Sequence, residues 1–243
     1  MNWTDEAIVL SVRAHGETAV IAELLTRAHG RHLGLIHGGR SRRLSPVLQT
    51  GNHLDVSWKG RLPEQLGHYS VELRRGFAGE AMATGDPARL AALSSMATLA
   101  RLLAERDPHP ALYEVTLFVL GFFDDASVWP ALVVRWELAL LDELGFGLDL
   151  ASCAATGSND QLRYVSPRSG RAVSASAGEP YRDKLLALPS FLAGRSGSGA
   201  TPADVVEGLR LTGYFLKRRV LEPHGKVMPE VRLRLADILA RQA

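Results

Sequence analysis

Cysteine is nearly absent from this sequence. Cys153 is the only one among 243 residues, so an internal disulfide and a zinc site of four thiolates are both excluded by counting. Long apolar runs are absent as well: the longest, at 111–123 and 129–141, are interrupted by charged residues and fall short of the roughly 20 apolar residues that a membrane span needs. Hydrophobic residues still make up 46% of the chain, which indicates a folded globular protein.

Positive charge is missing from the N-terminus, where a secretory signal would carry it. The opening residues carry Asp5 and Glu6 instead, and no small-residue cleavage site follows a proper apolar core. We therefore expect a cytoplasmic protein.

Catalytic motifs are absent too. The sequence contains no H-E-x-x-H, G-x-S-x-G, P-loop or G-x-G-x-x-G pattern. Acidic pairs such as Asp124-Asp125 are adjacent along a helix and point apart, unlike the convergent carboxylates of a hydrolase. His29 and His32 lie three residues apart, but no third ligand is evident, so we expect neither a metal site nor a cofactor. The sequence predicts that the protein is not an enzyme.

Between residues 7 and 75 the apolar pattern is that of short strands. Glycines recur between these segments and suit tight turns and barrel corners, because they accept a positive φ. Five strands of this length and spacing predict a small OB-like barrel. The strand-like segments are 7–13, 19–26, 31–37, 52–60 and 68–75.

The apolar period changes to that of helices after Asp86-Pro87. Asp86 suits an N-cap and Pro87 the first helical turn, where its missing N–H costs nothing. We therefore predict an α+β protein with an OB-like barrel in residues 1–80 and an α-helical domain in residues 81–243. The helix-like segments are 87–106, 111–123, 127–146, 181–192, 203–224 and 229–242.

Residues 150–180 interrupt the helical pattern. They are rich in Ser, Gly and Ala and contain one strand-like segment, 161–167, before the turn at 168–171. This composition predicts a small hairpin inserted among the helices. A Gly- and Ser-rich run, 194–202, precedes the last two helices.

Acidic residues are absent from residues 24–54, although basic residues are frequent there. Cations gathered on one element neutralise phosphates and release counterions, which gives sequence-independent and salt-dependent affinity for nucleic acid. Arginine side chains pair well with phosphate oxygens because their planar forks match them. A solubilising loop is the alternative interpretation of the same charges. The basic residues and histidines of the stretch are Arg27, His29, Arg31, His32, His37, Arg40, Arg42, Arg43 and His53.

We predict that the barrel binds DNA through its cations. Trp58 and Tyr69 lie close to some of them in the sequence and suit either a stacking platform for bases or the barrel core, and both interpretations stay open. The predicted DNA-binding residues are Arg13, Arg27, Arg31, His32, Arg40, Arg42, Arg43, Lys59, Arg61 and Arg74.

Three local patterns resemble the DNA repair protein RecO family. They follow one another in the family's order along the chain, and the first and third are the specific ones. The first is the barrel sequence with Gly16-Glu17-Thr18, Gly30-Arg31 and the loop at 38–43, the second is 48–49 with the strand at 54–58, and the third is the helix at 135–141 with Leu144-Gly145-Phe146-Gly147.

The resemblance implies a non-catalytic recombination mediator in DNA repair, associated with the nucleoid. Such a protein binds single- and double-stranded DNA without sequence preference and anneals complementary strands. It acts with RecR to load recombinase on single strands coated by single-stranded-DNA-binding protein (SSB). Annealing needs no chemistry, because a positive surface that screens phosphate repulsion suffices.

The resemblance also implies that the helical domain recognises the acidic, phenylalanine-ended tail of SSB. In this chain we place that site on the helix that bears Arg135, whose guanidinium suits the tail's carboxylate. Leu132, Leu138 and Leu141 would supply the apolar surface, although the same spacing also suits core packing.

The insert departs from the family's pattern of paired C-x-x-C motifs that bind zinc. Thr156 stands where the partner of Cys153 would be, and Ser174 and Ala177 occupy the positions of the second pair. We therefore predict a degenerate zinc-finger-like hairpin at 150–180 that holds no metal.

One alternative from another class stays open. A helical adaptor or scaffold whose barrel binds protein rather than DNA would have the same fold, and its acid-free stretch would serve solubility alone. Binding to a labelled single strand at several salt concentrations distinguishes the two.

Overall fold

The structure is a computed structural model that describes residues 1–62, 64–194 and 199–243. The middle of the Gly- and Ser-rich run at 194–202 therefore lies outside the described residues. The chain divides into two compact units, Met1–Leu120 and Gly121–Ala243. Within the described residues, no helix is long and apolar enough to cross a membrane.

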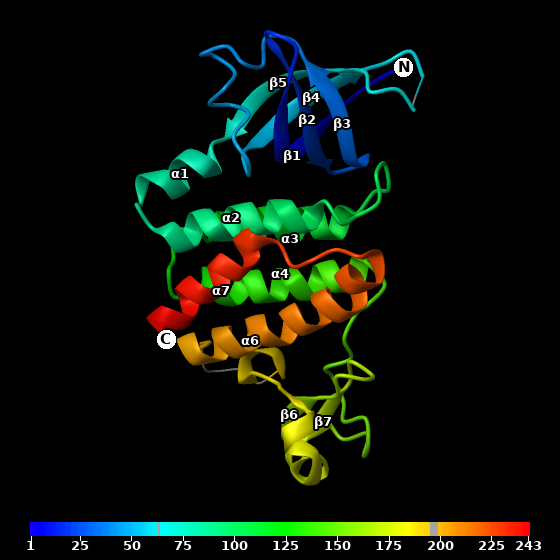
Figure 1. Cartoon of the computed structure of the whole chain (residues 1–243), viewed down its shortest axis with the longest axis vertical. Helices are drawn as coiled ribbons and strands as arrows, with labels where there is room; N and C mark the ends of the chain where they lie inside the picture. The colour runs from blue at the N-terminus through cyan, green and yellow to red at the C-terminus, as the bar shows by residue number, and fades with distance from the viewer. Residues whose placement is uncertain (63, 195–198) are drawn as a thin grey trace. The chain divides into compact units, whose positions relative to one another are not determined.

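Five strands of the first unit form a closed barrel in the order β1-β2-β3-β5-β4 (Figure 1). The long β1 closes the ring because its first half pairs with β4 and its second half with β2. A register shift between Val9 and Ser11 marks a bulge, which bends the strand between its two partners. The strands are β1 (Asn2–His15), β2 (Ala19–Thr26), β3 (Gly30–Ile36), β4 (His53–Lys59) and β5 (His68–Arg75).

The barrel has one thin seam, between β3 and β5. These strands run parallel and share a single registered pair, Leu35 with His68, supported by a hydrogen bond from the Leu35 N–H to the Gly67 carbonyl at 3.0 Å. Side-chain packing closes the rest of the seam, because a Cβ at Gly34 would lie only 2.3 Å from the ring of Tyr69. Because Gly34 has no side chain, the Tyr69 ring can lie against the backbone of β3.

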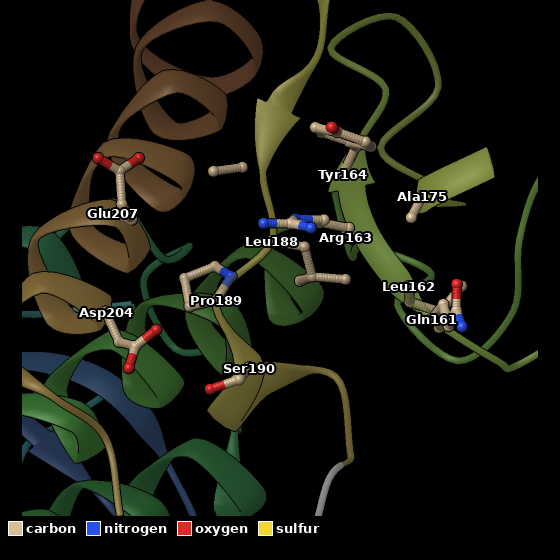
Figure 2. A pocket seen from close by; sticks show the side chains of 11 residues that line it. Gln161, Leu162, Arg163, Tyr164, Ala175, Leu188, Pro189, Ser190, Asp204 and Glu207 are labelled. Atoms are coloured by element: carbon tan, nitrogen blue, oxygen red, sulfur yellow. The ribbon is translucent and has the colours of Figure 1, made fainter. Parts of the chain in front are cut away.

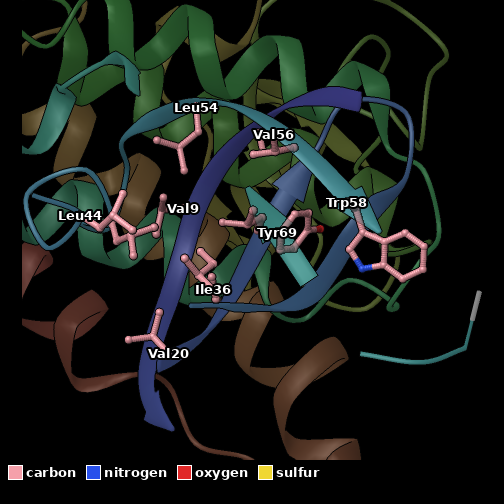
Figure 3. Packing of buried hydrophobic residues seen from close by; sticks show 12 residues of the cluster. Val9, Val20, Ile36, Leu44, Leu54, Val56, Trp58 and Tyr69 are labelled. Carbon is pink, nitrogen blue, oxygen red and sulfur yellow. The ribbon is translucent and has the colours of Figure 1, made fainter. Parts of the chain in front are cut away.

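Side chains from all five strands fill the barrel interior (Figure 3). Inward positions alternate with outward ones along each strand, as the two-residue period of a strand requires. Trp58 and Tyr69 are both buried there, at 2% and 4% exposure. The Trp58 Nε1 donates to the Leu66 carbonyl at 3.1 Å, so its polar atom is satisfied. Core packing, one of the two interpretations of these rings, is therefore confirmed.

Three helices follow the barrel: α1 (Phe77–Ala83), α2 (Pro87–Ala100) and α3 (Pro110–Gly121). The predicted cap of α2 is confirmed, since the Asp86 side chain accepts a hydrogen bond from the Ala88 N–H at 2.8 Å. The sequence does not predict α1, because its seven residues are too few to show a helical period.

Three longer helices pack together in the second unit, with α6 next to both others (Figure 1). They are α4 (Trp129–Glu143), α6 (Pro202–Phe215) and α7 (Glu230–Gln242). Helix α6 continues into a π-helix, η3 (Leu216–Leu221), and a short 3-10 helix, η4 (Glu222–His224).

The insert forms a three-stranded sheet rather than a hairpin alone. Strands β6 (Leu162–Val165) and β7 (Ala172–Ser174) make the predicted hairpin, and β8 (Leu186–Ala187) pairs with the other edge of β6. A four-residue helix, α5 (Ala175–Gly178), follows β7.

The prediction of a helix at 181–192 is wrong. The segment holds most of one 3-10 helix, η1 (Glu179–Lys184), and the whole of another, η2 (Ser190–Leu192), on either side of β8. Backbone pairing with β6 competes with helix formation here, and Pro189 ends the strand.

The α+β class is confirmed, with an OB-like five-stranded domain followed by a helical domain. The domain boundary near residue 80 stays a prediction.

A buried ion pair joins α4 to α7 in the second unit. Glu137 and Arg232 are 0% and 3% exposed, and the Arg232 Nη2 donates to a Glu137 carboxylate oxygen at 2.9 Å. The same nitrogen donates to the Leu209 carbonyl of α6 at 2.8 Å, and the Thr212 hydroxyl donates to Glu137. The network therefore ties three helices at one point.

Replacing one partner of this pair should destabilise the second unit strongly. In Arg232→Leu the Glu137 carboxylate stays buried without its cation, so the free energy of unfolding should fall by about 3–5 kcal/mol. The double variant Glu137→Leu/Arg232→Leu removes both charges and should recover most of the loss. Urea unfolding followed by the helical circular dichroism signal measures both; a single variant that unfolds at the wild-type midpoint contradicts the expectation.

Candidate nucleic-acid interface

One row of paired residues crosses the barrel on its outer surface. Arg13 of β1 pairs with Ile21 of β2, and Ile21 pairs with Leu35 of β3. Leu35 pairs with His68 of β5, and His68 with Lys59 of β4. Directly paired residues point to the same face of a sheet, and the residues next to them along each strand fill the core. The row therefore presents Arg13, His68 and Lys59 to solvent, and all three are exposed.

The arginine loop follows β3 directly. Arg40 is held against the β1–β2 turn, because its N–H donates to the Thr18 carbonyl at 3.1 Å and its guanidinium to the Glu17 carbonyl at 2.8 Å. These acceptors are neutral and leave the charge of Arg40 uncompensated. Arg42 and Arg43 are exposed, and within the described residues neither side chain has a hydrogen bond or an ion pair.

Five exposed cations without an acidic partner in the described residues form what we term the cationic rim. Two come from strands and three from the loop, and all five side chains are exposed to solvent. Arg61, also predicted as a contact, is exposed in the loop after β4. The rim consists of Arg13, Arg40, Arg42, Arg43 and Lys59.

Three other predicted contacts are engaged in ion pairs instead. Their guanidinium groups are already neutralised by carboxylates, so a phosphate would have to displace an acid to reach them. The structure does not bring these residues into the rim. The pairs are Arg27–Glu114 at 2.7 Å, Arg31–Glu23 at 2.5 Å, Arg74–Glu6 at 2.7 Å and Arg74–Asp55 at 2.8 Å.

His32 lies in the barrel core. It is 3% exposed, and its Nδ1 lies 2.9 Å from the Tyr69 hydroxyl. Burial lowers the pKa of His32 to about 4, and repulsion from Arg106 adds to this shift. His32 is therefore a neutral core residue, and the structure does not support a phosphate contact for it. The alternation of β3 explains the difference, since Arg31 and Leu33 take the outward positions beside it.

The outer face of β1, β4 and β5 is acidic at the end away from Lys59. A groove of roughly 520 Å³ lies there, and Glu6, Asp55 and Glu72 line it. Arg74 neutralises part of this charge through its two ion pairs. A phosphate backbone is repelled by such a surface, whereas the rim carries the opposite charge.

The predicted SSB-tail residues lie on α4, and three of the four are accessible. Arg135 is exposed; its guanidinium donates to the Phe191 carbonyl and lies over the Phe191 ring, 5.8 Å from the centroid. Leu132 and Leu138 are half-buried. Leu141 is fully buried and belongs to the core, so it cannot supply a docking surface.

A cavity of roughly 670 Å³ lies between the insert's sheet and α6 (Figure 2). Leu162 and Leu188 line one part of it, while Asp204 and Glu207 of α6 line another. Arg163 is the one cation among the lining residues, so the two acids leave the wall with net negative charge, which disfavours an acidic peptide. The cavity is therefore a poorer place for the tail than the surface around Arg135.

Cys153 is buried in the insert and contacts Ser174. Its sulfur accepts the Ser174 N–H at 3.3 Å and lies 3.5 Å from the Ser174 hydroxyl. Burial raises the pKa of the thiol, but hydrogen bonds from Ser174 and Thr156 outweigh this and lower it to about 6. Within the described residues no three His, Cys, Asp or Glu side chains stand close enough to share a metal ion. The residues at this position do not fit the four-ligand zinc site of the family pattern.

The DNA-binding residues predicted from the sequence do not include two exposed rings that the structure brings together. His37 and His68 stack on each other, with ring centroids 4.9 Å apart and planes 20° apart. The pairing of β3 with β5 brings the two rings together, and nothing in the sequence near either histidine indicates that these strands pair. The acid-free stretch contains His37, and this is the one feature of the sequence that could have indicated it.

These features define a class of protein: an OB-like barrel with an exposed cationic rim, joined to a helical domain. The families described as Recombination protein O N terminal and Recombination protein O C terminal match residues 1–77 and 84–227. The chain therefore belongs to the RecO family, and its role is in DNA repair and recombination.

Relatives named DNA repair protein RecO match the chain over nearly its full length. Identity to the protein of Methylobacterium nodulans is 56% over 236 residues, covering 96% of this chain and 95% of that one. Identity to the protein of Rhodospirillum centenum is 57% over 242 residues, covering 98% and 94%. Identity to the protein of Rhodopseudomonas palustris strain TIE-1 is 50% over 244 residues, covering 99% and 97%.

The buried His32 should make stability depend on pH. An unfolded chain protonates His32 near the ordinary pKa of 6.5, whereas the folded protein resists protonation down to about pH 4. The free energy of unfolding should therefore fall as pH drops from about 6.5 to about 4, by up to about 1.4 kcal/mol per pH unit. His53, whose pKa burial also lowers, adds to the loss.

Urea unfolding at several pH values measures this dependence. His32→Gln should show a shallower loss than the wild type across the same window, while His15→Gln, at an exposed position, should follow the wild type. Equal slopes for all three proteins would show that His32 does not titrate as its burial requires.

Proposed function

We propose that the cationic rim binds the DNA backbone without reading its sequence, and that the protein uses this surface to anneal complementary strands in the cytoplasm, at the nucleoid. The observation that carries the proposal is the set of exposed cations, above all Arg42 and Arg43, that have no acidic partner in the described residues. Phosphate contacts of this kind release counterions and depend on charge rather than on base identity.

Annealing fits such a surface because it needs no bond to be made or broken in the DNA. Two strands repel each other through their phosphates, and exposed arginines reduce that repulsion while both strands search for register. The loop places three arginines within four residues, from Arg40 to Arg43. No catalytic step is part of this proposal.

We propose further that the protein acts as a recombination mediator with RecR and SSB, loading recombinase on SSB-coated single strands. Membership of the RecO family supports this role, together with a basic and apolar surface on α4 that suits the acidic, phenylalanine-ended SSB tail. On that surface Arg135 would pair with the tail's carboxylate, and Leu132 and Leu138 would contact its apolar residues.

The arginine loop provides the test of DNA binding. In Arg40→Ala/Arg42→Ala/Arg43→Ala, affinity for a labelled mixed-sequence single strand should fall by about tenfold or more at low salt. The slope of log affinity against log salt should lessen by about two, because each lost phosphate contact removes about 0.7. Fluorescence anisotropy across a salt series measures both quantities.

The matched control is Arg27→Ala/Arg75→Ala/Arg182→Ala, which removes the same charge from exposed residues that already pair with acids. Its affinity and salt slope should stay near the wild-type values. If both triple variants lose affinity equally, net charge rather than the rim governs binding. If the wild type itself binds no DNA at low salt, the protein-binding adaptor becomes the better description.

The SSB-tail surface has its own test. Arg135→Ala should weaken binding of an acidic peptide that ends in phenylalanine by about tenfold, because a charge-assisted hydrogen bond is lost. Arg182→Ala removes an exposed arginine from another part of the second unit and should bind the peptide as the wild type does. Anisotropy of the labelled peptide measures the difference; equal affinity for all three proteins would place the tail elsewhere.

A further inference from the structure

Among the residues that the structure describes, the stacked pair of His37 and His68 is the one exposed ring stack of the barrel surface that no core contact explains. Both rings are exposed, and they come from the end of β3 and the start of β5. Their centroids lie 4.9 Å apart with planes 20° apart, an offset-stacked geometry. The pair spans the seam at which the barrel closes.

Strand pairing holds the backbone of His68 in place before any ligand arrives. Leu35 and His68 form the registered pair of the seam, and the Leu35 N–H donates to the Gly67 carbonyl next to His68. His68 is also paired with Lys59 of β4. Strand pairing fixes the backbone of His68 from both sides, and the stack on His37 restricts its ring, which lowers the entropy cost of binding.

The pair differs from the other histidines that the structure places in contacts. His29 contacts Asp5, His32 contacts the Tyr69 hydroxyl, His53 contacts the Tyr113 hydroxyl, and His224 contacts the Val220 carbonyl. Within the described residues His37 and His68 have no hydrogen bond or ion pair, and each has only the other ring against it. Their polar atoms and outer ring faces therefore remain available.

The surroundings of the pair suit a nucleic acid. The arginine loop begins directly after His37, and the row of paired residues runs from His68 through Leu35 and Ile21 to Arg13. Three strand spacings separate Arg13 from His68 along this row, which is about 14 Å. Ile21 of this row is buried, so the rings adjoin the arginine loop more directly than they adjoin Arg13. Cations next to exposed rings are the combination that single-strand-binding grooves use.

We propose that the His37–His68 pair is a base-stacking subsite that makes the cationic rim prefer single-stranded over double-stranded DNA. The inference rests on the proposed function, in which the rim holds the phosphates. An unpaired base can lie on an imidazole face, whereas a base inside a duplex is already stacked on its neighbours and cannot reach it. Trp58 and Tyr69 cannot take this role because they fill the core.

The test compares three labelled probes of equal length: a mixed-sequence single strand, a strand in which most nucleotides are abasic, and a blunt duplex. Anisotropy is measured at pH 8, where an ordinary imidazole is neutral. His37→Ala/His68→Ala should weaken binding of the intact single strand by about fivefold or more, the effect of losing one stacked base. Binding of the abasic strand and the duplex should change by less than about twofold.

Two replacement pairs separate ring stacking from charge and from folding. His37→Phe/His68→Phe keeps aromatic faces without charge and should retain the single-strand preference, whereas His37→Lys/His68→Lys adds charge without rings and should lose it. This comparison holds even if the alanine pair unfolds. His15→Ala changes an exposed histidine that has no ring partner among the described residues, and it should leave the ratio of single-strand to duplex affinity unchanged.

The outcomes distinguish failure of this inference from failure of the proposed function. Equal losses on all three probes in the alanine pair, or full restoration by the lysine pair, would overturn base stacking and assign the histidines to phosphate contacts, while DNA binding by the rim stands. Absence of binding to every probe by the wild type would overturn the proposed function itself.

Discussion

Closure of the barrel through both edges of β1 is the constraint on which the rest of the structure depends. Once β1 pairs with β2 and with β4, every residue of the five strands is fixed as inward or outward. The inward set includes Trp58 and Tyr69, and the outward set includes Lys59 and His68, their direct neighbours along the chain. Strand register thereby turns Arg13 and Lys59, which are far apart in the sequence, to the outside of the barrel, while the loop after β3 supplies the other cations of the rim.

Elements with strong local signals could be predicted from the sequence, and the partners of individual side chains could not. The five strands follow from alternation and glycine spacing, and the start of α2 follows from Asp86, because those signals lie within a few residues of their effect. Arg42 and Arg31 look alike in the sequence. They differ in the fold because Glu23 comes from a neighbouring strand to pair with Arg31, while no such acid reaches Arg42 within the described residues.

In the second unit, too, the local sequence around the insert does not reveal which segments pair with each other. Residues 181–192 have a helical apolar period, yet two of them form β8 because β6 offers an unpaired edge. Likewise Leu141 and Leu138 share an apolar spacing on α4, but only the packing of neighbouring elements buries the first and leaves the second half-buried. Where no tertiary contact favours another structure, the local sequence pattern determines whether a helix or a strand forms. Elsewhere long-range contacts determine it.

Because Tyr69 lies so close to Gly34, the residue that can occupy one of these positions depends on the residue at the other. A methyl group at residue 34 would collide with the Tyr69 ring, which lies where a Cβ would be. A larger residue at 34 is therefore compatible with closure only after the aromatic ring at 69 has been replaced by something smaller, and that change alone would leave a void in the core. We therefore expect residues 34 and 69 either to stay unchanged among related proteins or to change together, so that substitutions at the seam occur in pairs.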